Sequence, residues 1–561
     1  MWKPLLLCFL TLPIFAVAQN AAKPTRSVGP VAPHPSSAAF AAMETINPER
    51  IRAHVRFLAD DLLEGRGTGQ RGGDIAAQYI ATQLALYGLK PAGDNGTYLQ
   101  KVPMVGITPS PDTTFSLVPA GGSRMTLKVL EDYVSYDQTQ QPQSEVDAPI
   151  VFVGYGIHAP EYNWDDYKNT DVKGKVLLMM VNEPASDDPK FFKGKALTYY
   201  GRWTYKYEEA ARRGAVGVLL IHQTEMASYP WEVVRNSNSG EKSYLKLDDA
   251  PKLKAAAWIQ LDVARKLASS SGLNLEKIMS DARAREFKPI VLSAKLQARI
   301  ASKIRPFESN NVIGMLPGSD ARLRNEAVLY TAHYDHLGIR PDMPGDNIYN
   351  GANDNATGCG VLLEIARAFG QAAEKPRRSI LFASVTAEEQ GLLGSEYLGK
   401  HPPIPAAHIA LDLNFDDLPP LGAPEEVQVS GAERTSFYRT VEATAKDFRL
   451  SIRSDAHPEA GHFYRSDHFS LARVGVPAFS INEGIKYKGH DEAWGLDQDR
   501  EYNQKHYHQP SDEYRPDMDF TGDGTMARFG FLLGWQAASL PKVVDWEKGD
   551  EFEPARLKTA E

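Results

Sequence analysis

The adjacent glutamates Glu388 and Glu389 are the side chains of this 561-residue sequence whose positions are most suited to chemistry. They follow the apolar run from Ile380 to Val385, which predicts a buried strand, and the glycines after them predict a turn. Two carboxylates at the end of a buried strand are unfavourable unless a cation meets them. A divalent metal would hold one carboxylate and leave the other free as a general base. A solvated helix start would also explain an isolated pair, so its interpretation depends on the surrounding segments.

The segments that accompany this pair lie at the ends of other predicted elements. From about residue 305 the sequence alternates apolar strands and helices, which predicts an α/β sheet with helices on both faces. The expected elements are strands at 311–316, 327–332, 380–385 and 408–413 and a helix at 358–369. Because sites in open α/β sheets form outside the carboxyl ends of the strands, the polar segments should converge. These segments contain His333, Asp335, His336, Asp354, Asp416, Asp417, Asp467, His468, His508 and Asp512.

The types of these side chains indicate a metal centre. Imidazole and carboxylate ligands without thiolates suit zinc, and also manganese or cobalt. There are more carboxylates than one metal needs, which suggests two metals that share a bridging aspartate. Such a pair would lower the pKa of a shared water molecule and polarise a carbonyl group, which is hydrolytic chemistry.

Six motifs occur in order along this region. They are His-x-Asp, Asn-Gly-Ala-x-Asp-Asn-x-x-Gly, Glu-Glu-x-Gly-Leu-x-Gly-Ser, Asn-x-Asp, Ser-Asp-His and Tyr-His-x-Pro-x-Asp. A single match would fit ordinary polar residues at strand ends, but six in order do not. The sequence resembles the M28 family of metallopeptidases, the di-zinc aminopeptidases, over about residues 45–540. The intervening stretch contains Val-x-Val-Gly-Tyr-Gly, Val-Lys-Gly-Lys-Val and Ala-x-x-Gly-Ala-x-Gly-Val. With these motifs it is similar to the protease-associated (PA) domain that is often inserted in that family.

The resemblance implies a role for each matching residue. One metal would be bound by His333 and Asp416, the other by Glu389 and His508, and Asp354 would bridge the two. Two further roles follow from the same resemblance. Glu388 would act as the general base, and Asp335 would orient His333.

Some assignments stay open at the level of sequence. Asp412 and Asp417 compete with Asp416, which fits the Asn-x-Asp motif, and His506 competes with His508, which fits Tyr-His-x-Pro. For Asp467 and His468 three roles stay open: they line the substrate pocket, they support a ligand, or they make structural hydrogen bonds.

The chain divides into six stretches. Residues 1–18 have a short basic start, an apolar run and a small-x-small end, which predicts a signal peptide. Residues 19–43, rich in Ala, Pro and Ser, predict a disordered lead-in. Residues 44–129 form the N-terminal part of the peptidase domain, with a helix from Asn47 that carries Ile51, Val55, Leu58 and Leu62 on one face. The remaining stretches are a PA domain insertion at 130–290, the catalytic domain at 291–545 and a loose tail at 546–561.

Composition restricts the partners of the protein. The formal net charge is -9 and the sequence has no block of Lys and Arg, which disfavours nucleic acid or an anionic membrane surface as a partner. No run is long enough to span a membrane, and the signal peptide predicts export to a periplasm or the outside of the cell. The sequence does not specify the oligomeric state.

The leading functional hypothesis is an exported aminopeptidase with two zinc ions, for which manganese or cobalt would substitute. It would act on peptides with a free N-terminus. The alternatives are a carboxypeptidase or a glutaminyl cyclase on the same fold, or a receptor-like protein without catalysis. A carboxypeptidase needs cationic groups for the substrate carboxylate, and the sequence does not locate them.

Overall fold

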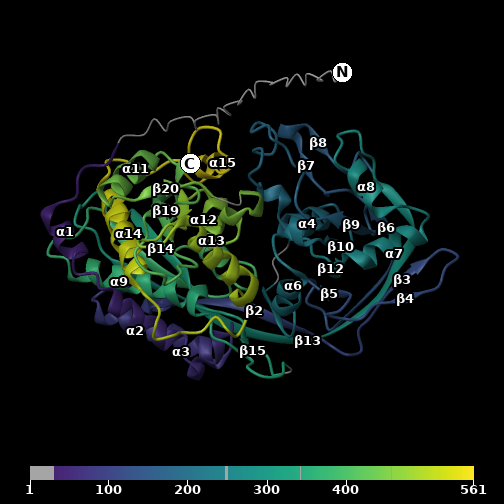
Figure 1. Cartoon of the computed structure of the whole chain (residues 1–561), viewed down its shortest axis with the longest axis horizontal. Helices are drawn as coiled ribbons and strands as arrows, with labels where there is room; N and C mark the ends of the chain where they lie inside the picture. The colour runs from purple at the N-terminus through teal and green to yellow at the C-terminus, as the bar shows by residue number, and fades with distance from the viewer. Residues whose placement is uncertain (1–30, 247–249, 342, 456–457, 561) are drawn as a thin grey trace, which may run out of the picture.

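The protein is described by a computed structural model over residues 31–246, 250–341, 343–455 and 458–560. The expected signal peptide at 1–18 lies outside the described residues. Two bodies lie side by side and are joined along one edge by the long strand β13 (Ile290–Leu316) (Figure 1). We call residues 31–109 and 302–560 the main domain, and residues 110–301 the inserted module.

The main domain is built on strands whose carboxyl ends meet. Strand β14 (Ala327–His333) pairs in parallel with β17 (Ser379–Val385) and β18 (Ile409–Asn414), and β18 pairs in parallel with β21 (Ala478–Ser480). His333 lies opposite Val385, so the segments that follow these two strands start at the same edge. Strand β13 pairs antiparallel with β17 and makes the sheet mixed. The other strands of the main domain are β1 (Lys90–Pro91), β2 (Leu99–Pro109), β15 (Gly338–Ile339), β16 (Ile348–Tyr349), β19 (Glu426–Gln428), β20 (Ser451–Arg453) and β22 (Asn482–Glu483). Strand β11 (Lys242–Leu245) belongs to the inserted module but pairs with β2.

Helices cover both faces of this sheet, which confirms the predicted α/β class. Alternate residues of a strand point to opposite faces. Tyr330 of β14 packs in one apolar cluster with α2 (Pro48–Leu58), α9 (Gly358–Gln371) and α14 (Thr521–Ser539). Its neighbour Leu329 packs in a second cluster against α10 (Leu393–Lys400) and α12 (His468–Arg473). The other main-domain helices are α1 (Ser37–Met43), α3 (Arg71–Leu86), α11 (Tyr438–Asp447), α13 (Glu492–Glu501) and α15 (Glu553–Ala560).

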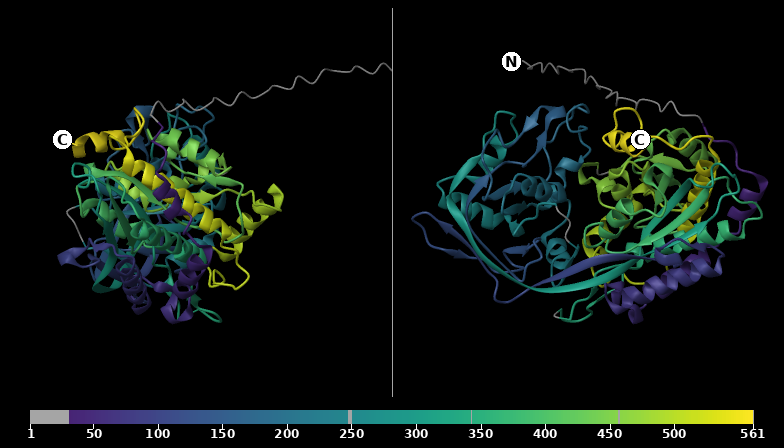
Figure 2. Two further views of the ribbon diagram at one scale, coloured as in Figure 1. Left: turned by 90° about the vertical axis from the view of Figure 1, so that its left-hand side faces the viewer. Right: turned by 180° about the vertical axis from the view of Figure 1, so that it is seen from behind.

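The inserted module has its own sheet and cores. Strands β6, β9, β10 and β12 run in parallel, and β5 and the first half of β13 pair antiparallel at the two sides. Figure 2 shows how β13 passes from this sheet into the main one. The module strands are β3 (Thr114–Pro119), β4 (Met125–Thr126), β5 (Tyr133–Tyr136), β6 (Gln143–Phe152), β7 (His158–Ala159), β8 (Trp164–Asp165), β9 (Val176–Met180), β10 (Gly217–His222) and β12 (Ala255–Gln260). The module helices are α4 (Trp203–Arg212), α5 (Thr224–Ala227), α6 (Trp231–Ser237), α7 (Leu261–Ser270) and α8 (Leu275–Asp281). Its assignment as a PA domain stays a prediction.

Several boundaries differ from those expected. The module starts near residue 110 instead of 130, because β3 pairs with β13 and β4 pairs with β3. The lead-in expected to be disordered up to residue 43 contains helix α1, whose Ala39 is fully buried. The tail expected to be loose from 546 is anchored by the buried side chains of Trp546 and Phe552. In these segments a few apolar side chains pack against residues that are distant in the sequence. The local composition does not predict such packing.

Helix α2 begins after Asn47, whose side chain accepts a hydrogen bond from the backbone N–H of Glu49. Ile51, Val55 and Leu58 are fully buried as expected. The expectation for Leu62 is wrong, because α2 ends at Leu58 and Leu62 is 76% exposed in the following 3-10 helix. Among the described residues, no helix combines the length and apolar character needed to cross a bilayer.

Arg66 joins three segments that surround the ends of the strands. Its fully buried guanidinium donates to the backbone carbonyls of Leu58, Tyr334, Asn350 and Gly351. Tyr334 directly follows β14, and Gly351 precedes the turn that carries Asp354. A buried cation is favourable only when its donors are satisfied, and here carbonyl oxygens satisfy them.

We predict that Arg66→Met destabilises the protein by at least about 3 kcal/mol, since it leaves buried carbonyl groups without donors. Urea unfolding followed by tryptophan fluorescence measures the effect. Arg71→Met is the matched control, because Arg71 is exposed and pairs only with Glu64 on the surface, so its change should stay within about 0.5 kcal/mol. Equal unfolding midpoints for the two variants would contradict this role of Arg66.

Candidate metal centre

Five segments meet at the carboxyl edge of the main sheet. His333 is the last residue of β14, Glu388 and Glu389 follow β17, and Asp416 follows β18. Asp354 comes from the turn at Ala352–Thr357 that leads into α9, and its backbone N–H donates to the Asp512 carboxylate. The fifth segment brings His508, which follows the turn at Tyr502–His506. These segments are separated by up to 175 positions in the sequence and converge because the strands are parallel.

Asp354 lies between the two histidines assigned to different metals. Its Oδ1 is 3.3 Å from His333 Nε2, and its Oδ2 is 3.2 Å from His508 Nε2. On the first side, His333 Nε2 is also 3.1 Å from Asp416 Oδ1. On the second side, His508 Nε2 is 3.0 Å from Glu389 Oε2. The side chains therefore form two groups that share one carboxylate, the arrangement that the motifs imply.

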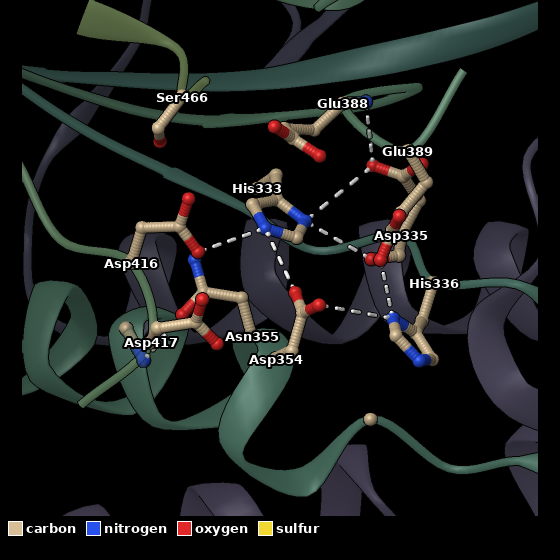
Figure 3. A network of polar contacts seen from close by, with 12 residues as sticks. His333, Asp335, His336, Asp354, Asn355, Glu388, Glu389, Asp416, Asp417 and Ser466 are labelled. Carbon is tan, nitrogen blue, oxygen red and sulfur yellow. Dashed lines mark hydrogen bonds and ion pairs between the residues drawn. The ribbon is translucent and has the colours of Figure 1, made fainter. Parts of the chain in front are cut away.

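His336 is a further member of the centre to which the motifs gave no role. Its Nδ1 lies 2.6 Å from Glu389 Oε1 and 3.9 Å from Asp354 Oδ2, and its side chain is fully buried (Figure 3). The Glu389 contact does not have hydrogen-bond geometry, and among the described residues His336 Nδ1 and Glu389 Oε1 have no other hydrogen-bond partner. A ring nitrogen and a carboxylate oxygen that face one another without hydrogen bonds have the arrangement expected of two ligands around a cation. The run His333-Tyr-Asp-His336 places His336 near the end of the strand and was the only sequence signal for it. The sequence does not show which of these polar side chains points toward the metal centre.

The competing residues are separated by their contacts. Asp417 accepts a hydrogen bond from the Tyr502 hydroxyl at 3.4 Å, and its carboxylate also lies within 4.8 Å of those of Asp354 and Asp416. Asp416, by contrast, lies 3.1 Å from His333 Nε2. His506 is directed to the Ser511 hydroxyl at 2.9 Å and lies outside the group. Asp412 accepts from the Thr331 hydroxyl inside the sheet. The geometry therefore favours Asp416 and His508.

Asp335 contacts His333 through its backbone carbonyl and not through its carboxylate. His333 Nδ1 donates to the backbone carbonyl of Asp335 at 3.1 Å, whereas the nearer carboxylate oxygen is 3.9 Å away. The carboxylate accepts instead from the Thr68 hydroxyl and from the backbone N–H of Glu388. Asp335 therefore fixes the backbone at Glu388, while its own carbonyl sets the ring orientation of His333.

Asp467 and His468 are buried beside the centre without joining it. The Nδ1 atom of His468 lies 3.4 Å from the side-chain amide nitrogen of Asn414, and the Asp467 carboxylate has no hydrogen-bond partner among the described residues. Burial raises the pKa of Asp467 to about 7, and the charge of His333 opposes that rise.

The electrostatics of the centre favour bound cations. Burial alone would lower the pKa of His333, but the carboxylates of Asp416 and Glu388 outweigh it and raise that pKa well above its usual value. Burial raises the pKa of Glu388 well above its usual range, His333 opposes this and Glu389 reinforces it. The candidate ligand atoms lie within 4.8 Å of one another in three overlapping sets, which are His333 with Glu388 and Asp416, His336 with Asp354 and Glu389, and Asp354 with Asp416 and Asp417. Imidazole nitrogens and carboxylate oxygens at this spacing fit divalent zinc.

Comparison with known proteins gives consistent results. The model of peptidase family M28 matches residues 311–528. Leupeptin-inactivating enzyme 1 of Streptomyces exfoliatus is 29% identical over 178 residues, 32% of this chain and 36% of that protein. A probable zinc metalloprotease of Pyrenophora teres f. teres is 30% identical over 152 residues, 26% of each chain. The matches thus span only about a quarter to a third of these relatives.

A solved structure supports the fold. An aminopeptidase from Aneurinibacillus sp. strain AM-1 superposes with a TM-score of 0.51 at 18% identity, covering 90% of this chain and 97% of that one. The matched region 311–528 contains all of the side chains grouped above. Residues 311–528 of this chain thus match peptidase family M28.

Proposed function

We propose that the protein is an exported aminopeptidase with two zinc ions, which hydrolyses the first peptide bond of peptides with a free N-terminus. The observation that carries this proposal is the position of Asp354, with one oxygen facing His333 and the other facing His508. A shared carboxylate between two groups of ligands supports a pair of metals. The relatives named as zinc metalloproteases support zinc, and manganese or cobalt would substitute for it.

The residues divide between the two ions. His333 and Asp416 would hold one ion, His508 and Glu389 the other, and Asp354 would bridge them. His336 is placed to support the second group through its contact with Glu389. When bound, the ions supply Lewis acidity, which lowers the pKa of water and polarises the scissile carbonyl.

Glu388 is the proposed general base. One of its carboxylate oxygens lies within 4.8 Å of candidate ligand atoms of His333 and Asp416, which is close enough to serve the same half of the centre. Its carboxylate would accept a proton from the attacking water and donate it to the leaving amine, so that one residue serves both proton transfers. The hydrogen bond from its backbone N–H to Asp335 fixes its position at the end of β17.

The second candidate function, release of the C-terminal residue, would need cationic groups beside the metal centre to hold the substrate carboxylate. Arg202 and Arg465 line a cavity between the inserted module and the main domain, but its volume of about 10 Å³ has room for no more than about one water molecule. This cavity therefore does not favour a carboxypeptidase.

A panel of short peptides, each with a free and an N-acetylated form, distinguishes the two functions. We expect release of the first residue from free-amine peptides only, since an acetylated amine lacks the charge that the carboxylate-rich centre attracts. Mass spectrometry of the products measures which end is cleaved. Equal cleavage of the acetylated forms, or release from the carboxyl end, would favour the carboxypeptidase instead.

We predict that Glu388→Gln lowers kcat by about 10²- to 10⁴-fold, because it removes the proton acceptor. The zinc content, measured by atomic absorption, should stay at the wild-type value. Glu396→Gln is the matched control, since Glu396 pairs with Lys400 on the surface of α10 and should leave kcat unchanged. Loss of zinc from Glu388→Gln would identify Glu388 as a ligand and not as the base.

Metal removal should lower thermal stability. The buried carboxylates repel one another without cations, so we expect the unfolding midpoint to fall by roughly 5–10 °C after treatment with a chelator. Differential scanning fluorimetry measures the midpoint, and added zinc should restore it whereas magnesium should not. An unchanged midpoint would show that the centre is stable without metal.

A further inference from the structure

A segment of the inserted module reaches the candidate metal centre. It consists of α6 (Trp231–Ser237), the following turn and β11 (Lys242–Leu245). Strand β11 leaves the module and pairs antiparallel with β2 at the edge of the main sheet. The segment therefore lies between the two bodies, next to the residues that follow β17.

Ser237 makes the contact nearest to the centre. Its hydroxyl oxygen lies 3.2 Å from His508 Nδ1, across 271 positions of sequence. With a metal ion bound at Nε2, Nδ1 would carry the proton and donate it to the hydroxyl, and the Nε2 lone pair would face the side of Asp354 and Glu389. A hydrogen bond at one ring nitrogen selects the tautomer that binds metal through the other.

The backbone of His508 needs such support. Its φ is +57°, in the left-handed region that non-glycine residues rarely adopt. The ring is held on one side by stacking on Tyr507, with ring centroids 4.0 Å apart, and Ser237 contacts its Nδ1 edge. The orientation of His508 thus depends on a side chain from outside the main domain.

The same segment also contacts the other ligand of this half. Lys242 is buried, and its Nζ donates to the backbone carbonyl of Glu389 at 3.4 Å. The backbone N–H of Ser243 donates to Gln390 Oε1 at 2.9 Å. Within the part of the chain that the structure describes, the segment has no hydrogen bond to His333 or Asp416. Its contacts are therefore confined to the half of the centre that contains Glu389 and His508.

The segment is itself held firmly. The Tyr136 hydroxyl of β5 donates to the carbonyls of Asn238 and Gly240, at 2.6 and 3.1 Å. From the main domain, Arg340 donates to the carbonyl of Asn236 at 3.4 Å. Ser237 is thereby fixed between both bodies.

We propose that Ser237 is a positioning residue through which the inserted module sets the zinc affinity of the Glu389–His508 half of the centre. The inference rests on the proposed two-metal function and extends it, because it assigns the module a part in completing the centre. The His333–Asp416 half has no such dependence, so the two zinc ions of one molecule respond differently to the same substitution.

Zinc titration of the metal-free, full-length protein against a chromophoric chelator tests this. We expect wild type to take up two equivalents, and Ser237→Ala to bind one of them about 10-fold more weakly and the other unchanged. Ser237→Thr keeps the hydroxyl and should restore the affinity. Ser239→Ala is the matched control, since Ser239 donates only to the carbonyl of Asn236 in the same turn. With cobalt as the probe, the absorption of only one equivalent should change in Ser237→Ala.

Two results would overturn the proposal. The first is that Ser237→Ala leaves both zinc affinities unchanged. The second is that Ser237→Ala and Ser239→Ala weaken both zinc affinities to the same extent, which would indicate a general loosening of the turn. If wild type itself binds fewer than two equivalents, the two-metal function fails first and this inference fails with it. The wild-type stoichiometry therefore separates the two failures.

Discussion

The crowding of carboxylates at one edge of the main sheet is the constraint on which the rest of the structure depends. Asp354, Glu389 and Asp416 lie within contact of two histidines, and Glu388 and Asp417 are close by. Two like charges 4 Å apart repel by about 4 kcal/mol at an effective dielectric constant of about 20. Histidines alone do not neutralise such a group, whereas divalent cations do. The buried carboxylates are thus the strongest argument for metal.

The scaffold around the centre holds the strand ends in place against this repulsion. Arg66 connects the segments after α2 and β14 to the turn that carries Asp354, and Asp512 accepts the backbone N–H groups of Asn353 and Asp354. Asp335 holds the backbone of Glu388. Each of these residues acts through the backbone, which fixes the direction of a ligand without taking up its side-chain atoms.

The inserted module is continuous with this scaffold. Strand β13 belongs to both sheets, and the pair Lys193–Glu551 and the bond from Leu197 N–H to the Pro458 carbonyl join the two bodies far from that strand. The module therefore contacts the main domain at several places. These contacts fix the position of its α6–β11 segment relative to the ligands of the main domain. A module attached by one flexible linker would not hold a hydroxyl at hydrogen-bond distance from His508.

The sequence by itself determined the class of fold, the strands and the kind of centre. Apolar runs such as Ile380–Val385 predict strands, because the local hydrophobic pattern shows where each strand begins and ends. The parallel arrangement then predicts that His333, Glu389 and Asp416, which follow strand ends, lie close together. Only the tertiary structure decided what depends on distant contacts. The directions of His336 and Asp335, the continuation of β13 into the module, and the burial of Trp546 arise from partners that local sequence does not specify. Ser237 is the clearest case, since nothing in its neighbourhood distinguishes it from Ser239, and its importance comes from a residue 271 positions away.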